Sequence, residues 1–293
     1  MKEIDFTLCP RVPTRAYAGA NGKKVAIEFE GAVWLLKFPL SAADKPNELL
    51  YSNSSISEHL GSTVYRLLGV DAQETRLGVH CNGRTKIVCA CRDFTVPGKR
   101  LLDFCSIKNS VLEGESGGTG TELSEVLDAI AGQQFLDPTV VLTRFWEMFV
   151  VDAFLGNFDR HNGNWGFLVD DATGKVDLAP VFDCGSCLLP QADETIMRKV
   201  LASEDELNAR IMTFPNSMLK QNGRKIVYRD YLASSDDPTL KAALARLLPR
   251  IHALDIVALI NEMPYLTDLQ RDFYIRYLTA RRERVFECQA NVK

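Results

Sequence analysis

The paired cysteine and histidine ligands that a structural zinc site needs are missing from this sequence. The chain has eight cysteines and four histidines, yet Cys184 and Cys187 form its single CxxC pair, with no second pair at metal-ligand spacing. A redox dithiol at this pair is one interpretation, and small buried thiols in a reduced compartment are the simpler one. We therefore expect no structural zinc.

An excess of positive charge is also absent. The chain has 34 Lys and Arg residues against 38 Asp and Glu, which gives a formal net charge of −4, and its basic residues form no stripe. Nucleic acids and anionic membranes attract basic surfaces, so the sequence predicts neither as a partner. It carries no pattern that fixes the oligomeric state.

Segments that would direct the chain to a membrane are lacking as well. The N-terminal stretch Met1–Asp5 is charged and has no apolar core of a secretory signal. The most apolar segment, residues 139–157, contains Arg144, Glu147 and Asp152 and is too short and too charged to span a bilayer. We therefore expect a cytoplasmic protein, while export without a signal would leave no trace in the sequence.

Apolar residues are plentiful enough for one domain or two closely packed lobes, because they make up 46% of the 293 residues. Pro138, followed by apolar side chains on almost every face, predicts a buried core helix over residues 139–157. After Pro190, amphipathic runs predict scaffold helices near residues 194–212, 239–262 and 267–288.

The most informative motif follows the predicted core helix. It reads Asp159-Arg160-His161-Asn162-Gly163-Asn164, and Asp183 stands nineteen positions further on. An Asp five residues before an Asn can reach a substrate hydroxyl while the Asn amide oxygen turns to a metal ion. With Asp183, these are oxygen ligands suited to Mg²⁺. An isolated Asp or Asn is more often a turn former than a functional residue. The neighbouring sequence is therefore needed to choose between these two interpretations.

That context is a predicted β-hairpin between Asn164 and Asp183. Residues 165–169 form an apolar run, residues 170–175 (Asp-Asp-Ala-Thr-Gly-Lys) a turn, and residues 176–181 the returning strand. The two ends of a hairpin lie at one edge, so both candidate metal ligands come together. The pattern favours a phosphoryl-transfer centre.

Strands are predicted before this centre. Residues 24–30 and 33–38 are β-branched or aromatic runs joined at Gly31, and residues 85–91 form a further run. Lys37 ends the second run, where a lysine is either a surface residue with a buried stem or a ligand of nucleotide phosphates. Glu58, on a predicted helix over residues 54–68, is its candidate partner. Glu58 also stands at capping-box spacing from Ser55, and both roles stay open.

These motifs together resemble the HipA-like serine/threonine kinases, whose catalytic loop carries Asp-Arg-His-x-x-Asn. Phosphoinositide kinases share that loop, and Leu178-Ala179-Pro180-Val181-Phe182-Asp183 narrows the resemblance to the HipA side. The chain is most similar to the short, CtkA-type members, which lack the extra N-terminal domain of full-length HipA toxins. The resemblance extends from about Tyr17 to Leu189.

The resemblance implies a nucleotide site and assigns residues to it. Lys37, paired with Glu58, would clamp the phosphates of ATP, and Cys91 and Asp93 would lie at the hinge under adenine. The turn Gly19, Ala20, Asn21 and Gly22, otherwise an ordinary Gly-containing hairpin turn, would expose backbone N–H groups to phosphate. No Ser precedes Ala18-Gly19, so the family's self-inhibition through that residue is not expected here.

We therefore predict an α+β, two-lobed protein-kinase-like fold, with a β-rich lobe over residues 1–95 and a mainly helical lobe over residues 96–293. Asp159 would orient or deprotonate a Ser/Thr hydroxyl of a protein substrate, and Asn164 and Asp183 would bind Mg²⁺, or Mn²⁺ in its place. A lipid or small-molecule kinase is an alternative, although the apolar and acidic segment 188–194 disfavours anionic lipid. A non-catalytic nucleotide-binding module is another, and the intact Asp159, Asn164 and Asp183 argue against it.

Overall fold

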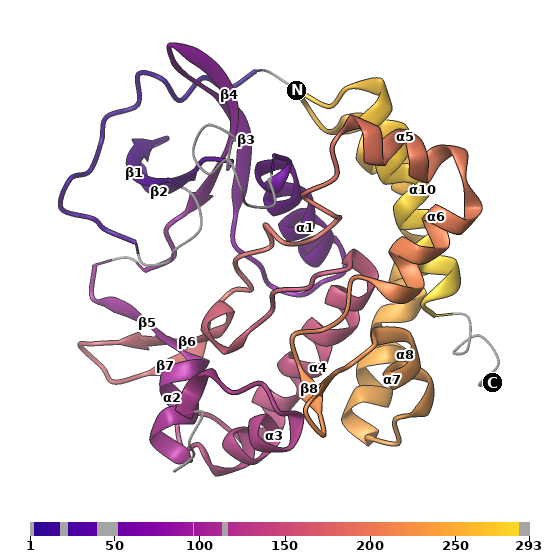
Figure 1. Cartoon of the computed structure of the whole chain (residues 1–293). Coiled ribbons are helices and arrows are strands. Elements are labelled where there is room, and N and C mark those ends of the chain that lie inside the picture. Colours follow the sequence, from indigo (N-terminus) through magenta and orange to yellow (C-terminus); the bar gives the residue numbers. More distant parts are fainter. Residues whose placement is uncertain (1–2, 18–22, 40–51, 96, 113–116, 287–293) are drawn as a thin grey trace.

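An antiparallel sheet with the order β1-β2-β4-β3 forms the N-terminal part of the molecule (Figure 1). The computed structural model describes residues 3–17, 23–39, 52–95, 97–112 and 117–286. The four strands are β1 (Lys24–Phe29), β2 (Ala32–Lys37), β3 (Thr75–Asn82) and β4 (Arg84–Arg92). Glu30 and Gly31 both have positive φ angles, of 50° and 70°, which is the geometry of a tight hairpin turn. The hairpin predicted at Gly31 is confirmed.

Helix α1 (Ser54–Leu67) covers the side of this sheet that faces the rest of the molecule. Its buried side chains point both to the sheet and to the helical part, so the helix has no wide polar face. Strand β3, which follows it, was not predicted from the sequence. Gly78 interrupts the alternation of apolar and polar side chains in this strand. The N-terminal segment packs so closely here that a Cβ at Gly78 would lie 2.5 Å from Phe6 Cε2, so the position requires glycine.

A second antiparallel sheet carries the predicted hairpin, and its order is β5-β6-β7. Its strands are β5 (Lys99–Asp103), β6 (Gly166–Asp170) and β7 (Val176–Leu178). The hairpin prediction is confirmed, but the returning strand is shorter than residues 176–181. Val181 leaves the sheet and pairs instead with the segment before β3, donating to the Asp71 carbonyl at 2.9 Å.

The core helix predicted after Pro138 is α4 (Pro138–Leu155), and the structure confirms it. Asp137 caps its start by accepting a hydrogen bond from the Thr139 N–H at 2.8 Å. Gly156 ends it with a left-handed φ of 66°. Side chains from nearly every turn of α4 are buried, so the helix passes through the centre of the larger part of the molecule.

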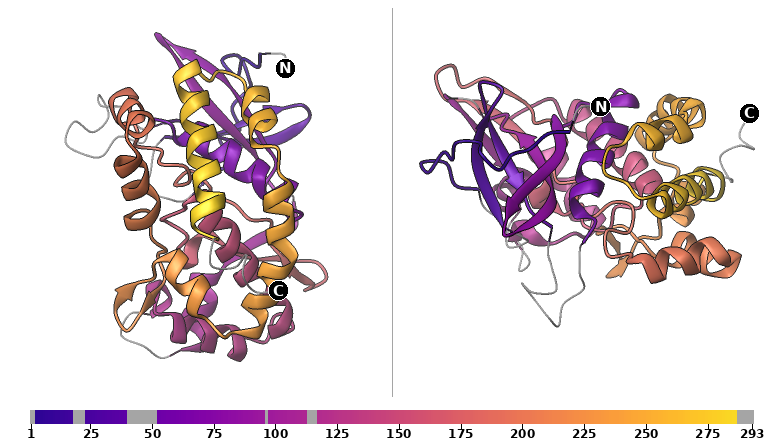
Figure 2. Two further views of the ribbon diagram at one scale, coloured as in Figure 1. Left: turned by 90° about the vertical axis from the view of Figure 1, so that its right-hand side faces the viewer. Right: turned by 90° about the horizontal axis from the view of Figure 1, so that it is seen from above.

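Helices make up most of the remaining chain, with one short hairpin among them. Helix α2 (Phe104–Val111) lies next to the second sheet and α3 (Leu123–Gly132) packs against α2 and α4, while most of the C-terminal helices lie on the other side of α4 (Figures 1 and 2). The C-terminal elements are α5 (Glu194–Ala202), α6 (Glu204–Asn208), the single π turn η3 (Ala209–Thr213), β8 (Lys220–Gln221), β9 (Arg224–Lys225), α7 (Tyr228–Ser234), α8 (Pro238–Ala253), α9 (Ile256–Glu262) and α10 (Asp268–Arg284).

The long C-terminal helices expected from the sequence are interrupted. Ser203 is extended and caps α6 through its hydroxyl, which accepts the Glu206 N–H at 3.3 Å and divides the run predicted over residues 194–212. Leu254 and Asp255 divide the run predicted over residues 239–262, because Asp255 caps α9. In both places a capping side chain competes with continuation of the helix.

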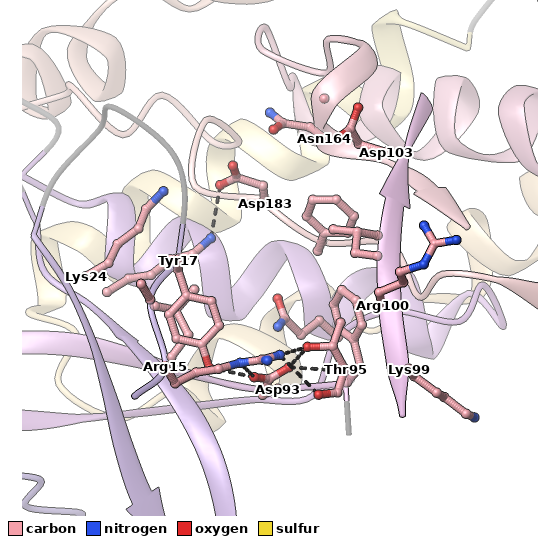
Figure 3. Close-up of a pocket in the computed structure, with 18 of the residues that line it drawn as sticks. Arg15, Tyr17, Lys24, Asp93, Thr95, Lys99, Arg100, Asp103, Asn164 and Asp183 are labelled. Atoms are coloured by element: carbon pink, nitrogen blue, oxygen red, sulfur yellow. Dashed lines mark hydrogen bonds and ion pairs between the residues drawn. The ribbon is translucent and has the colours of Figure 1, made fainter. Parts of the chain in front are cut away.

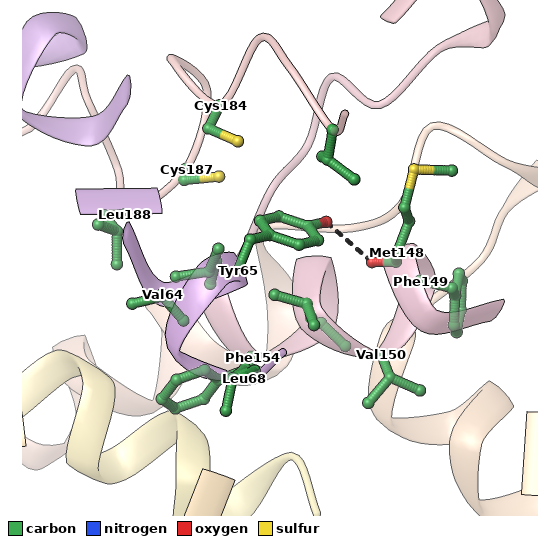
Figure 4. Packing of buried hydrophobic residues seen from close by; sticks show 14 of the residues in the cluster. Val64, Tyr65, Leu68, Met148, Phe149, Val150, Phe154, Cys184, Cys187 and Leu188 are labelled. Carbon is green, nitrogen blue, oxygen red and sulfur yellow. Dashed lines mark hydrogen bonds between the residues drawn. The ribbon is translucent and has the colours of Figure 1, made fainter. Parts of the chain in front are cut away.

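One large hydrophobic cluster spans both parts of the molecule. It includes residues of β2 and β4, of α1 and of the helices through α10. Figure 4 shows Tyr65 of α1 beside Met148 of α4, with Cys184 and Cys187 above Tyr65 and Leu188 to its left in the same cluster. A smaller cluster around Trp34 fills the other face of the first sheet. The predicted α+β architecture is confirmed. No helix in the described ranges combines the length and apolar character of a bilayer span.

Candidate active site

A pocket of about 540 Å³ lies between the first sheet and the β5-β6-β7 sheet (Figure 3). The N-terminal segment, both sheets, the loop after α4 and the segment after β7 contribute its walls. The lining residues are Arg15, Ala16, Tyr17, Lys24, Leu35, Lys37, Gln73, Asp93, Phe94, Thr95, Lys99, Arg100, Leu101, Asp103, Asp159, His161, Gly163, Asn164, Phe182 and Asp183. The fold therefore brings Lys37, Asp93, Asp159, Asn164 and Asp183 to one cavity.

Lys37 joins two carboxylates at the inner end of this pocket. Its Nζ lies 2.9 Å from Glu58 Oε2 and 3.0 Å from Asp183 Oδ1, and its side chain is only 17% exposed. Burial lowers the pKa of Lys37, but attraction to Asp183 and Glu58 outweighs burial and holds the pKa well above its ordinary value. The alternative of a surface lysine is therefore wrong.

Glu58 has no capping function in α1. The residue at the N-cap is Asn53, its side chain makes no capping hydrogen bond, and the Ser55 hydroxyl has no hydrogen-bond partner. Instead, Glu58 is buried, pairs with Lys37, and accepts the backbone N–H of Cys184 at 3.2 Å through Oε1. The sequence left two roles open for Glu58, and in the structure Glu58 forms the ion pair with Lys37.

Asp159 and Asn164 lie on a tight loop that leaves α4, and the turn η2 (Asn162–Asn164) forms its second half. The Asn164 side-chain amide donates to the Asp159 carbonyl at 2.9 Å, and the Asn157 side chain accepts the Asp159 N–H at 3.0 Å. These hydrogen bonds fix the orientation of the Asn164 amide, because its nitrogen is already bonded and its oxygen remains as an acceptor.

Arg160 connects this loop to the strand that precedes Asp183. Its guanidinium pairs with the buried Asp152 of α4, with Nε 3.0 Å from Oδ2, and donates to the carbonyls of Asn164 and Phe182. The Tyr65 hydroxyl donates to the same Asp152 carboxylate at 2.7 Å. A single buried cation thus fixes both segments that carry candidate metal ligands, which supports its interpretation as a positioning residue.

Asp183 adopts a left-handed backbone with a φ of 59°, a conformation that non-glycine residues rarely adopt. The chain just before it is held by the Gln73 N–H, which donates to the Val181 carbonyl at 2.8 Å. The adjacent α1 requires glycine at Gly61, where a Cβ would lie 2.8 Å from Cys184 Cβ. The strained residue is therefore fixed from both sides, as is common where a functional carboxylate has to be aimed.

The two pocket aspartates have opposite electrostatic environments. The Lys37 ammonium lowers the pKa of Asp183 to about 2, against the opposing effect of burial. Burial raises the pKa of Asp159; the Asp183 charge adds to this increase, while His161 opposes it. Asp183 is thus held as an anion, whereas Asp159 is more basic than an ordinary aspartate. Paired carboxylates with separated pKa values are typical of sites that move a proton.

The donor set of this pocket fits a hard divalent cation. The Asp183 carboxylate and the Asn164 amide oxygen are both oxygen ligands, and phosphate oxygens of a nucleotide could supply further ones. Within the described ranges, no group of three or more His, Cys, Asp or Glu side chains is placed to hold a metal by protein ligands alone. Such a partial set is typical of Mg²⁺ bound together with its substrate.

The other end of the pocket is closed by a polar cluster around Asp93 (Figure 3). Its Oδ2 accepts hydrogen bonds from Arg15 Nε and from the Tyr17 hydroxyl, both at 2.7 Å, and its Oδ1 accepts the Thr95 N–H at 2.8 Å. Burial raises the pKa of Asp93, but these donors outweigh it and lower the pKa. The Asp93 carboxylate therefore already has protein partners.

Cys91, which the family resemblance assigned to the hinge, does not line the pocket with its side chain. Its thiol is fully buried in the large cluster, 3.9 Å from Cys89 Sγ. Asp93, Phe94 and Thr95 line the pocket instead. The turn Gly19–Gly22 lies outside the described residues. The expected roles of all these residues in nucleotide binding stay predictions.

Several pocket residues were not found by sequence reasoning. Lys99, Arg100 and Asp103 come from β5, and they reach the pocket because β5 pairs with β6, for example Leu102 with Phe167. Lys24 comes from β1. No motif marks these residues, since their positions depend on pairings between distant segments. Tyr17 stands where the family resemblance begins, and Arg15 lies two residues before it. The start of the resemblance is therefore the feature of the sequence that points to these two pocket residues.

Comparison with known proteins agrees with this geometry. The sequence family described as the HipA-like C-terminal domain matches residues 16–236 of this chain. The serine/threonine-protein kinase CtkA of Helicobacter pylori is 42% identical over 291 residues, which cover 98% of this chain and 87% of the relative. The crystal structure of the H. pylori proinflammatory kinase CtkA matches with a TM-score of 0.86 and 39% identity, over 98% of this chain and 96% of that chain.

A more distant match is limited to the fold. HipA of Shewanella oneidensis MR-1, solved with HipB and operator DNA, matches with a TM-score of 0.55 and 17% identity, over 95% of this chain and 65% of that chain. The family model covers most of the chain, the CtkA match covers nearly all of it, and both agree with the Asp-Arg-His-x-x-Asn loop in the pocket. The chain belongs to the HipA-like family of serine/threonine protein kinases.

Proposed function

We propose that this kinase transfers the γ-phosphate of ATP, in the presence of Mg²⁺, to serine or threonine hydroxyls of a protein substrate. The observation that carries the proposal is the Lys37 ammonium held between Glu58 and Asp183, in the same pocket as Asp159 and Asn164. Phosphoryl transfer depends mainly on positioning and on electrostatic stabilisation, and this arrangement supplies both.

The assigned roles follow from the environment of each group. Lys37 presents a permanent positive charge to the nucleotide phosphates, and Glu58 keeps it in place. Asp159 accepts or orients the proton of the attacking hydroxyl, since its raised pKa makes it the more basic aspartate. Asn164 and Asp183 hold Mg²⁺, and Mn²⁺ can take its place. The bound cation would neutralise charge on the phosphate oxygens.

The lobe organisation is part of the same proposal. Residues 1–95 would form the nucleotide-clamping lobe and residues 96–293 the lobe that carries the catalytic loop and the metal ligands. The Asp93 cluster with Arg15 and Tyr17 lies where these lobes meet, and we assign it to the adenine end of the pocket. Phe94 and Phe182 support this assignment, because their rings are 5.7 Å apart across the junction.

Two conservative variants separate the roles of the aspartates. Asp183→Asn should lose the Mg²⁺-dependent part of ATP affinity together with activity. Asp159→Asn should bind Mg²⁺-ATP nearly as the parent does, yet transfer phosphate at least roughly 10²-fold more slowly. Calorimetric titration with and without Mg²⁺, beside a phosphotransfer assay, measures both effects. Full turnover by Asp159→Asn, or parental Mg²⁺-ATP affinity in Asp183→Asn, would overturn the assignment.

The class of acceptor needs its own experiment. Purified protein with radiolabelled ATP and a cell lysate should label proteins on serine or threonine, and Asp159→Asn should abolish the label. Label recovered only in the lipid fraction would favour the lipid-kinase alternative. The segment after Asp183 speaks against that alternative, because Leu188 and Leu189 are buried rather than part of a basic surface.

A further inference from the structure

The hairpin β8-β9 carries an exposed pair of like charges near the candidate active site. Lys220 and Lys225 stand directly opposite each other in the two strands, so their side chains share one face of the hairpin. The next pair inward, Leu219 and Ile226, is buried and anchors the hairpin to the core. Both lysines are exposed, and like charges directly opposite one another destabilise a strand pair.

None of the described carboxylates forms a salt bridge with Lys220 or Lys225. The recorded side-chain contact of Lys225 is with Met218 Sδ, at 3.5 Å from its Nζ. Glu122 lies against the hairpin, but its carboxylate accepts the backbone N–H groups of Asn222, at 2.6 Å, and Gly223, at 3.1 Å. Glu122 therefore holds the turn in place through backbone contacts and forms no salt bridge with either lysine.

The hairpin is tied to the catalytic loop through a short chain of hydrogen bonds. The Asn162 side chain, between Asp159 and Asn164, donates to the carbonyls of Gly118, at 2.7 Å, and Gly120, at 2.8 Å. The Thr121 carbonyl next to them accepts the Lys220 N–H at 2.8 Å. Figure 1 shows the hairpin next to α3, the helix that starts just after this segment.

The Lys225 ammonium and the Asp159 carboxylate attract each other electrostatically. This ammonium is among the groups that oppose the rise in the Asp159 pKa. The hydrogen bonds through Asn162 and Thr121 place the hairpin beside the loop that carries Asp159, so a substrate segment bound at Asp159 would pass close to the lysine pair.

We propose that Lys220 and Lys225 bind acidic side chains close to the phosphoacceptor of the protein substrate. This inference rests on the proposed function, and it narrows the substrate class to serines or threonines in an acidic context. Carboxylates docked on this face would relieve the repulsion between the two ammonium groups, and they would place the acceptor hydroxyl next to Asp159.

Peptide binding tests the inference independently of catalysis. The probe is a fluorescein-labelled extended peptide with one central serine flanked by Asp and Glu, and its partner carries Asn and Gln at the same positions. By fluorescence anisotropy, the parent should bind the acidic peptide about 3- to 10-fold more tightly, and this preference should shrink as salt rises. Lys220→Gln/Lys225→Gln should lose the preference, and Lys220→Glu/Lys225→Glu should reverse it.

A matched control removes the same amount of charge elsewhere. Lys199→Gln/Lys241→Gln changes two exposed lysines of α5 and α8 and should keep the preference. An acidic preference that survives in Lys220→Gln/Lys225→Gln, or that is absent from the parent, overturns the inference. A third peptide with phosphoserine in place of the acidic residues tells which source of negative charge binds more tightly.

Phosphate transfer to the same peptides, measured in parallel, reports on the proposed function. The ratio of kcat/KM for the acidic peptide to that for the neutral peptide should follow the binding preference in every variant. If no peptide or protein receives phosphate while the lysine-dependent preference persists, the kinase proposal fails and the binding surface stands.

Discussion

At the scale of single residues, the pocket is organised around one buried cation. Lys37 neutralises two carboxylates, one from α1 and one from the segment after β7. Burying charges is costly, and a pair of this kind is stable only while both signs are present. Lys37 therefore bears on the stability of the protein as well as on the proposed chemistry.

Lys37→Met should abolish phosphate transfer and also destabilise the protein by about 3–5 kcal/mol, because Glu58 would keep a buried negative charge with no cationic partner. Denaturant unfolding followed by circular dichroism measures this loss. Adding Glu58→Gln to Lys37→Met should restore part of the stability and none of the activity. A Lys37→Met protein as stable as the parent would show that the ion pair is not structurally important.

In the proposed mechanism, the pH dependence of activity at acidic pH is set by Asp159. A general base has to be ionised, so kcat/KM should rise with pH through the pKa of this carboxyl, and burial raises that pKa above the ordinary 3.8. We expect the acid limb of the kcat/KM profile to have an apparent pKa above 3.8 and to be absent from the residual activity of Asp159→Asn. An acid limb of the same position in both proteins would assign it to another group.

At the scale of elements, the contact between β5 and β6 holds the catalytic loop against the pocket wall. Gly166 begins β6 directly after the loop, and a Cβ there would overlap the Leu102 carbonyl oxygen and lie 2.7 Å from Asp103 Cα. Both neighbours are backbone, so neither can turn away. The strand pairing that brings Lys99 and Arg100 to the pocket therefore depends on glycine at this position.

Gly166→Ala should separate β5 from β6 and cost about 1–3 kcal/mol, the range expected for overpacking. Activity should fall together with stability, because the displaced strand adjoins Asn164. Calorimetry and a phosphotransfer assay measure the two effects. Gly132→Ala at the end of α3 is the control, since the added methyl meets a valine side chain that can move. Equal melting temperatures for Gly166→Ala and the parent would contradict this account.

At the scale of the whole molecule, the sheet-rich and helical parts share a hydrophobic core. Helix α1 lies between them, and its Tyr65 hydroxyl reaches the Met148 carbonyl, at 3.1 Å, and the Asp152 carboxylate of α4. Arg250 of α8 also donates to the Leu68 carbonyl at 2.8 Å. Two parts joined in this way cannot lose their packing independently.

Thermal unfolding should therefore occur as a single cooperative transition, with a calorimetric enthalpy equal to the van't Hoff enthalpy. Nucleotide with Mg²⁺ should raise the temperature of that one transition, because it binds only the folded protein. Differential scanning calorimetry with and without Mg²⁺-ATP measures both. Two resolved transitions would mean that the parts unfold separately and that α1 does not couple them.

Signals between neighbouring residues were enough to locate the local elements and the candidate site motifs. Periodicity and turn residues located α4, the hairpins at Gly31 and at residues 170–175, and the loop with Asp159 and Asn164, because these signals depend on neighbours in the chain. The sequence also identified Asp183 and Lys37, although the roles of these residues stay predictions. The choice between ion pair and helix cap for Glu58 was beyond it, since both share one spacing.

The contacts between residues of distant segments follow only from the tertiary structure. It placed Glu58 next to Lys37 because α1 packs against the segment after Asp183, and it left Cys91 in the core. It brought β5 and its basic residues to the pocket and the β8-β9 hairpin near Asp159. Strand pairing and core packing join residues that are between about twenty and more than a hundred positions apart, and no pattern of neighbouring residues in the chain encodes such contacts.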